Sequence, residues 1–246
     1  MRKIYRPALL LLIVLIGCSK DSKLGPGTGT GGSLARFTIA KDHLYVVDGN
    51  SLHTFGLQNP AGPVKLGSLM LSLEGEVETI YPWGDQLFIG TMSAMHIISI
   101  SRAGEPKYQG SAFHVTACDP VVANGQYAYV TVRTGNNCGG NANSLEGFDV
   151  TNPVSPALKF TIQLSNPHGL GLSGNYLYVC DAEAGLVVFD ITDAAIPEKL
   201  NTITGHTFID CIPIGNLLIT MVTNGMVLYD ISNPAEPVYL SEILNG

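Results

Sequence analysis

The sequence predicts an all-β protein, a β-propeller of five blades with four antiparallel strands in each. An apolar phrase that ends near an aspartate recurs along the chain, most clearly at 185–193 and 225–233. Its copies are 41 to 49 residues apart, and a period of forty-odd residues is typical of propeller blades. The equivalent positions are Leu44, Leu87, Ala128, Leu177 and Leu218. No window shows a 3.6-residue apolar period, which excludes a helical solenoid.

The fourth copy shows the expected strands in order. They are rich in β-branched and aromatic residues, and Gly, Asn, Asp and Pro separate them. We expect strands at Gly169–Leu172, Tyr176–Cys180, Leu186–Ile191 and Lys199–Ile203. No strand is exchanged between the first and last copies, so the ring is either closed by apolar packing of blade one on blade five or is an open arc completed by another chain.

The first 33 residues predict a leader and a tether. Residues 1–17 combine a basic start with the apolar run Ala8–Ile16, which is too short to span a bilayer, since that takes about 20 residues. Gly17-Cys18 at its end resembles a bacterial lipobox, which implies that Cys18 is lipidated. The alternatives are an ordinary secretory signal and a cytosolic chain with an apolar start. Residues 18–33 read as a flexible Gly/Ser/Thr tether, and residues 34–246 as the propeller.

Charge and motifs exclude several classes of function. The formal net charge is −7 and no Lys/Arg cluster is present, so nucleic acid is excluded as a partner. The sequence also contains no Gly-rich phosphate loop, no Gly-x-Ser-x-Gly turn and no His-Glu-x-x-His motif. The acid pair Asp181 and Glu183 falls in a turn, where we expect it to be solvated.

Propeller geometry predicts where a site would lie. The first strand of each blade lines the central channel, and its start lies on the same rim as the loops between second and third strands. Four blades place an acid or a histidine at this rim, and Arg133 begins a long inserted loop in blade three. The candidate rim residues are Glu78, Asp119, Arg133, His168 and Asp210.

These side chains have two interpretations. Carboxylates together with an imidazole could hold one divalent cation, Ca²⁺ or Zn²⁺, in the central channel, with Glu78, Asp119, His168 and Asp210 as candidate metal ligands. Alternatively, each side chain bonds backbone amides of a neighbouring loop, as Asp and His often do at strand starts. In the same way, Arg133 either pairs with Asp119 or holds an anionic group.

Apart from Cys18, the cysteines divide into two pairs. Cys118 begins the channel strand of blade three, and Cys138 lies in the inserted loop of the same blade. In an oxidising compartment we expect a disulfide between them. Cys180 and Cys211 lie inside apolar runs, where buried free thiols are expected. A Cys180–His168 nucleophile is formally possible, but the spacing neither orients nor activates it.

The chain resembles the LVIVD-repeat proteins, β-propellers frequent among Bacteroidetes lipoproteins. The apolar phrase ending in an aromatic residue and Asp, followed by Asn/Asp-Pro and a second Pro, carries the resemblance, which covers Leu34–Leu244 and is strongest over Cys118–Tyr239. Copies one and two depart from it, with Gly56 and Ser99 at the Asp position, so the repeat Asp is a weak candidate for catalysis. The resemblance implies an envelope location, at the outer membrane, with the periplasmic or the surface side left open.

Two classes of function remain. The first is a membrane-tethered binding or scaffold module, which meets protein, peptide or glycan partners at the rim and contacts the membrane through its lipid anchor only. The second is a metal-assisted hydrolase or lyase at the channel mouth. Because propellers host both classes, the fold does not decide between them. The absence of a catalytic motif favours the binding module.

Overall fold

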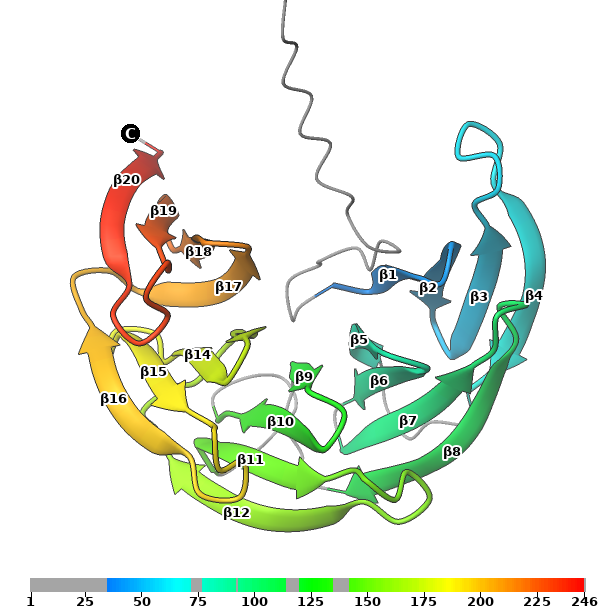
Figure 1. Ribbon diagram of the computed structural model, residues 1–246, viewed down its shortest axis with the longest axis horizontal. Helices are drawn as coiled ribbons and strands as arrows, with labels where there is room; N and C mark the ends of the chain where they lie inside the picture. Colours follow the sequence, from blue (N-terminus) through cyan, green and yellow to red (C-terminus); the bar gives the residue numbers. More distant parts are fainter. Residues whose placement is uncertain (1–34, 72–76, 92, 114–119, 135–141, 246) are drawn as a thin grey trace, which may run out of the picture.

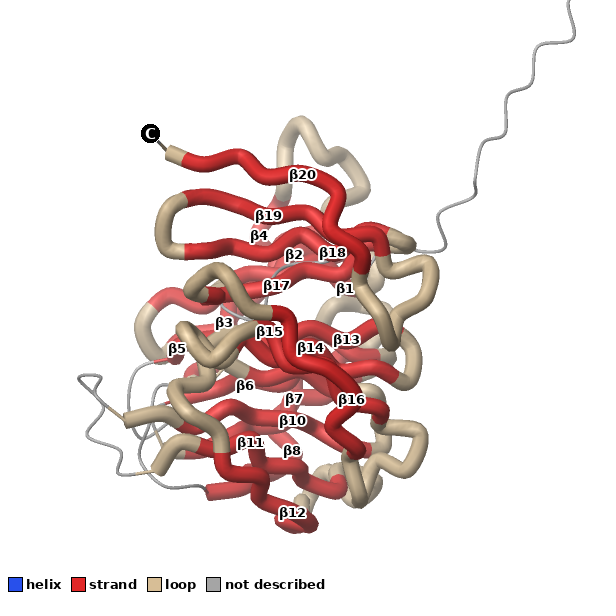
Figure 2. The backbone as a smooth tube through the Cα atoms, turned by 90° about the vertical axis from the view of Figure 1, so that its left-hand side faces the viewer, coloured by secondary structure: helices blue, strands red, loops and turns tan. Residues whose placement is uncertain are grey.

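The computed structural model describes residues 35–71, 77–91, 93–113, 120–134 and 142–245, and these form five four-stranded antiparallel sheets with no helix. The sheets are arranged around a common centre, with the first strand of each sheet innermost (Figure 1). Figure 2 shows the same strands and loops from the side. The predicted five-bladed propeller is therefore confirmed. Within the described residues, no helix is long and apolar enough to cross a membrane.

Each blade runs from its inner to its outer strand in chain order. Blade one contains β1 (Phe37–Ala40), β2 (His43–Asp48), β3 (Ser51–Gly56) and β4 (Val64–Met70). Blade two contains β5 (Val77–Trp83), β6 (Gln86–Thr91), β7 (Ala94–Ile100) and β8 (Pro106–Phe113). Blade three contains β9 (Val121–Ala123), β10 (Tyr127–Val132), β11 (Ser144–Asp149) and β12 (Ala157–Gln163). Blade four contains β13 (Leu170–Ser173), β14 (Tyr176–Cys180), β15 (Leu186–Asp190) and β16 (Glu198–Ile203). Blade five contains β17 (Phe208–Ile214), β18 (Leu217–Val222), β19 (Gly225–Asp230) and β20 (Val238–Leu244).

The strand pairing repeats from blade to blade in detail. In all five blades the register between the third and fourth strands shifts once, at the same place relative to the repeat. Such a bulge increases the local twist of a strand pair. The shift lies at Thr54/Phe55, Ile97/Ile98, Gly147/Phe148, Val188/Phe189 and Leu228/Tyr229.

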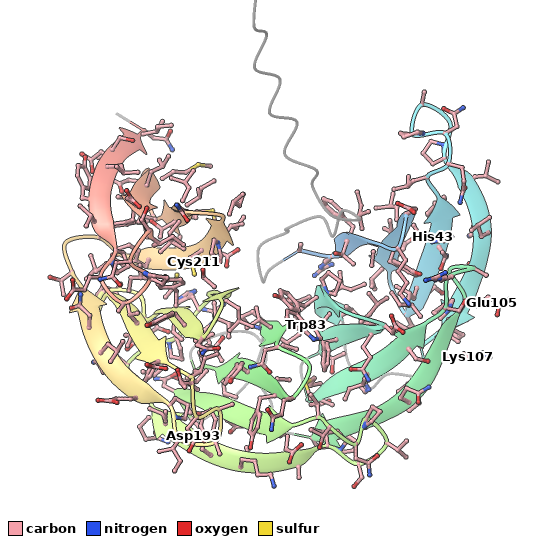
Figure 3. All side chains as sticks on the ribbon, viewed as in Figure 1. His43, Trp83, Glu105, Lys107, Asp193 and Cys211 are labelled. Carbon is pink, nitrogen blue, oxygen red and sulfur yellow. The ribbon has the colours of Figure 1, made fainter. Side chains whose placement is uncertain are left out.

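Four apolar clusters hold the blades together, one between each pair of consecutive blades. Because blades two, three and four are covered on both sheet faces, their second and third strands are buried almost throughout. Cys180 of blade four and Cys211 of blade five share one of these clusters, and Figure 3 labels Cys211 on the inner strand of blade five. Both are buried free thiols, as the sequence predicts.

The arc of blades is open. Inner strands of consecutive blades contact each other, β1 with β5, β5 with β9, β9 with β13 and β13 with β17. Among the described residues no strand of blade five packs on a strand of blade one, and Figure 1 shows a gap between them. Of the two alternatives for ring closure, the structure has the open arc.

Trp83, the only tryptophan of the chain, joins two blades near the centre. It ends β5 and lies against Gly125 of blade three, where an added Cβ atom would be 2.2 Å from the indole Nε1. Gly125 also has a φ of 86°, a conformation that L side chains rarely adopt. Glycine therefore allows both the turn and the approach of the ring.

Several of the predicted features lie outside the described residues. These are the leader, the tether, the lipidation site, the rim carboxylate of blade three and the predicted disulfide, namely residues 1–17, residues 18–33, Cys18, Asp119 and the Cys118–Cys138 pair.

Candidate functional site

Three of the predicted rim residues come together at the junctions of blades three, four and five. Arg133 follows β10, His168 precedes β13 and Asp210 lies in β17. The backbone N–H of Gly169 donates to the carbonyl of Ile209 at 2.8 Å, which joins the start of blade four to blade five. An added Cβ atom on Gly169 would lie 2.0 Å from Oδ1 of Asp210. The His168–Gly169 corner and the Asp210 carboxylate are thus in direct contact.

Backbone hydrogen bonds on both sides hold His168 in place. Its N–H donates to the carbonyl of Cys180 at 2.7 Å, and its carbonyl accepts from the Thr131 hydroxyl of blade three at 2.5 Å. Burial lowers the pKa of its imidazole, and the Arg133 charge lowers this pKa further, while two nearby carboxylates oppose the shift. A cation and a half-buried imidazole therefore share this part of the rim.

Asp181 is a structural acid at the same rim, and the expectation that it is solvated is wrong. Its side chain is buried. One carboxylate oxygen accepts from the backbone N–H groups of Ser165 at 3.0 Å and Asn166 at 2.6 Å. A buried carboxylate with two backbone donors is well satisfied. It fixes the loop that leads into the channel strand of blade four.

Glu78 has a different neighbour from the other rim residues. Its Oε2 is 3.9 Å from Nη2 of Arg36 at the start of blade one, so it links blades one and two. Within the described parts of the chain, no group of three or more His, Cys, Asp and Glu side chains is placed to hold a metal ion. Asp119 is outside those parts, and the divalent cation and the hydrolase or lyase alternative stay predictions.

The repeat aspartates act in turns. In blades three, four and five the Asp ends the third strand, and its Oδ1 accepts the backbone N–H of the Ser or Thr two residues later, at 2.7 to 3.1 Å. The hydrogen bond from the Ser or Thr hydroxyl and then this backbone bond hold the pKa of each Asp below its usual range. These Asp residues are Asp149, Asp190 and Asp230. They serve turn formation, the common role of Asp at such positions.

The gap in the arc exposes a blade face that is buried everywhere else. In the second strand of blades one to four, one position carries a fully buried aromatic ring that faces the next blade. These rings are Tyr45, Phe88, Tyr129 and Tyr178, each 0% exposed. Blade five has Ile219 at this position, half-buried and with no blade beyond it.

The third strand shows the same contrast in numbers. The residues equivalent to Met226 in blades one to four are all 0% exposed, whereas Met226 is 47% exposed. The four equivalents are Leu52, Met95, Leu145 and Leu186. Around Met226 a shallow hollow of about 120 Å³ is lined by apolar side chains and one carboxylate. Its lining is Asp210, Ile212, Ile219, Met221 and Met226.

Blade one exposes the opposite half of the same interface. Leu44 is half-buried, whereas its equivalents in the other blades are 0% exposed. These equivalents are Leu87, Ala128, Leu177 and Leu218. Val46 and Phe55 lie beside Leu44 on this face. The two ends of the arc therefore present the two sides of a blade-to-blade contact.

Comparison with family models finds the LVIVD repeat in this chain, over residues 116–163, 168–202 and 217–244. These segments cover parts of blades three, four and five. Comparison with curated protein sequences finds no match.

Solved structures share the arrangement of the blades. A protein from Lactobacillus plantarum superposes with a TM-score of 0.65 at 13% identity, over 83% of this chain and 69% of its own. BamB from Moraxella catarrhalis has a TM-score of 0.51 at 14% identity, over 85% of this chain and 60% of its own. BBS1N, solved in complex with ARL6DN, has a TM-score of 0.58 at 15% identity, over 84% and 65%. At these identities the likeness shows the fold alone, and in the latter two the chain spans less than two thirds of the neighbour. The chain is therefore a β-propeller that carries LVIVD repeats.

Proposed function

We propose that this protein is an extracytoplasmic binding module, tethered to the bacterial outer membrane by a lipid on Cys18, that holds a protein partner in the gap of its arc. One observation carries the proposal. Both ends of the arc expose apolar positions that are fully buried in every other blade. Contiguous apolar surface of this kind marks a site of interaction with other proteins.

The chemistry of the two exposed faces favours a folded protein over other partners. Each face is one side of a four-stranded sheet, and the side chains that line its hollow are mainly apolar. Such a surface offers little to a phosphate backbone, which the acidic chain also repels. The rim with Arg133 and His168 is a neighbouring polar area, where a peptide or glycan segment of the same partner would be bound. A neighbour of the same fold, BBS1N, was itself solved with a second protein.

Photo-crosslinking in intact cells tests this function. A benzoyl-phenylalanine replaces Met226 at the gap or, as the matched control, Leu158, which is 53% exposed on the outer strand of blade three. We expect a protein adduct at Met226 and none at Leu158. If irradiation gives no adduct at Met226, or equal adducts at both positions, the gap is not a docking site.

A further inference from the structure

The exposed face of blade five is suited to bind the same face of a second copy of the chain. We propose that the partner in the gap is a second copy of this chain, with blade five packed on blade five around a two-fold axis. This inference rests on the proposed function, since it uses the same surface and names its occupant.

Strand pairing makes the free face of blade five one continuous apolar area. Cross-strand neighbours lie side by side on one face of a sheet. One row runs through Met221, Met226 and Ile243, and the next runs through Ile212, Ile219 and Leu228. Met221, Met226 and Ile243 are 38%, 47% and 66% exposed. These six residues define the blade-five face.

This face carries few charges, and its methionine side chains are flexible. Two carboxylates are near: Asp210 pairs with Met221 at the inner end of the first row and lines the hollow at Met226, and Asp230 pairs with Leu217 beside the second row. The six residues of the blade-five face themselves carry no charge. The methionines have flexible and polarisable side chains that fill irregular gaps. Such side chains suit a contact in which each residue must fit a copy of itself or of its neighbours.

The four interfaces inside the chain show what covers such a face. In each of them an apolar blade face is covered by another blade of the same family, and the core positions are fully buried. A second copy supplies another such blade. Two sheets packed face to face are also a common arrangement in β proteins.

The width of the gap selects blade five on blade five over a head-to-tail arrangement. In the head-to-tail case, blade one of a partner would follow blade five and its next blades would continue the same arc. The five blades already take up more than half of the ring in Figure 1, so five further blades on the same curve would overlap them. A two-fold axis at the blade-five face instead puts one blade of each copy into the gap of the other.

The free face of blade one is the less suitable of the two for self-association. His53 and Ser68 lie across it in a hydrogen bond of 2.7 Å, and Asp48 borders the hollow beside Val46. Pairing two such faces would bury polar groups at a cost. Substitutions on blade one therefore serve as a control.

Light scattering on the full chain, extracted from membranes in mild detergent, tests the proposal. We expect a protein mass of twice the chain. In Met226→Lys the self-association should weaken at least a hundredfold, which gives a monomer at micromolar concentration. The matched control Val46→Lys, on the blade-one face, should stay a dimer. Loss of the dimer in both variants would point to a head-to-tail contact, and a monomeric wild-type chain would overturn the second copy as partner.

A second measurement does not depend on a destabilising lysine. In Met226→Cys a short bismaleimide should join two copies, whereas Leu158→Cys should give no such product. A Met226 photo-adduct that contains a different protein would overturn this inference and leave the proposed function in place. An absence of every adduct would remove the proposed function itself.

Discussion

The hydroxyl of Tyr178 in blade four donates a hydrogen bond to the carbonyl of Pro234 in blade five at 2.8 Å. The Tyr178 ring is fully buried. Burial, and then the neighbouring Cys211, raise the pKa of its hydroxyl, so it stays a donor throughout the physiological range. A single side chain thus joins the core of one blade to the outer turn of the next.

Tyr178→Phe tests this link. The variant keeps the ring in the cluster and leaves the Pro234 carbonyl without this donor, which should cost about 1 kcal/mol of unfolding free energy. Chemical denaturation followed by fluorescence measures the change. Blade two already has Phe88 at the equivalent position, so the fold itself accepts the ring without a hydroxyl. An unchanged midpoint would show that the bond contributes nothing.

The contact of Gly169 with blade five gives a second prediction. In Gly169→Ala the new methyl group would lie 2.0 Å from Oδ1 and 2.8 Å from Cα of Asp210. The side-chain oxygen can move, but the backbone atom cannot move without separating the two blades. We expect a loss of about 1–3 kcal/mol, measured by denaturant titration.

Gly67→Ala is the matched control, because nothing lies within 4 Å of a Cβ atom there. Its midpoint should differ from wild type by less than the uncertainty of the titration. Equal stability of Gly169→Ala and Gly67→Ala would contradict the close packing at this junction.

The strands of blade four show how far the sequence pattern reaches. The second strand was predicted over Tyr176–Cys180 and is β14 with the same bounds. The other three agree to within one residue at each end. Alternation of apolar residues and the turn residues between them specify such strands locally. Because the same pattern recurs in each copy of the repeat, it predicts the strands of all five blades.

The gap and the rim bonds were not predictable in the same way. Whether five blades close a ring depends on the rotation between neighbouring blades. Side-chain packing between the blades sets this rotation, and the alternation of residues along a strand does not reveal it. The sequence signal for the open end is the change of residue at the last copy, where Ile219 replaces an aromatic ring. Asp181 was misread because its partners are backbone N–H groups of another loop, which leave no pattern in the sequence.

The two free thiols between blades four and five give a third prediction. Burial, and then the hydrogen bond with Cys211, raise the pKa of the Cys180 thiol well above its usual range. The thiolate is the reactive form of Cys180, and both thiols are buried away from solvent. Both should therefore resist an aromatic disulfide reagent in the folded protein and react in denaturant. Peptide mapping by mass spectrometry identifies the two sites. Rapid labelling of either thiol under native conditions would contradict their burial.

The rim histidine gives a prediction of pH dependence. Burial and then the Arg133 charge lower the pKa of His168 below its usual 6.5. The unfolded chain therefore binds a proton at a higher pH than the folded chain. Unfolding free energy should fall as the pH drops from about 7 through 6.5 to the lower folded pKa, and this loss should level off below it. Denaturant titrations at a series of pH values measure the slope.

Two variants separate His168 from the other groups that titrate in this range. His168→Gln should flatten the slope between pH 7 and 5, because the variant has no imidazole at this site. Arg133→Gln should move the His168 pKa upward, measured by NMR of the imidazole, since the repelling charge is gone while the burial remains. A His168 pKa that does not respond to Arg133→Gln would separate the two residues in solution. Arg133 and His168 would then not act together as the polar area that we propose binds a peptide or glycan segment of the partner.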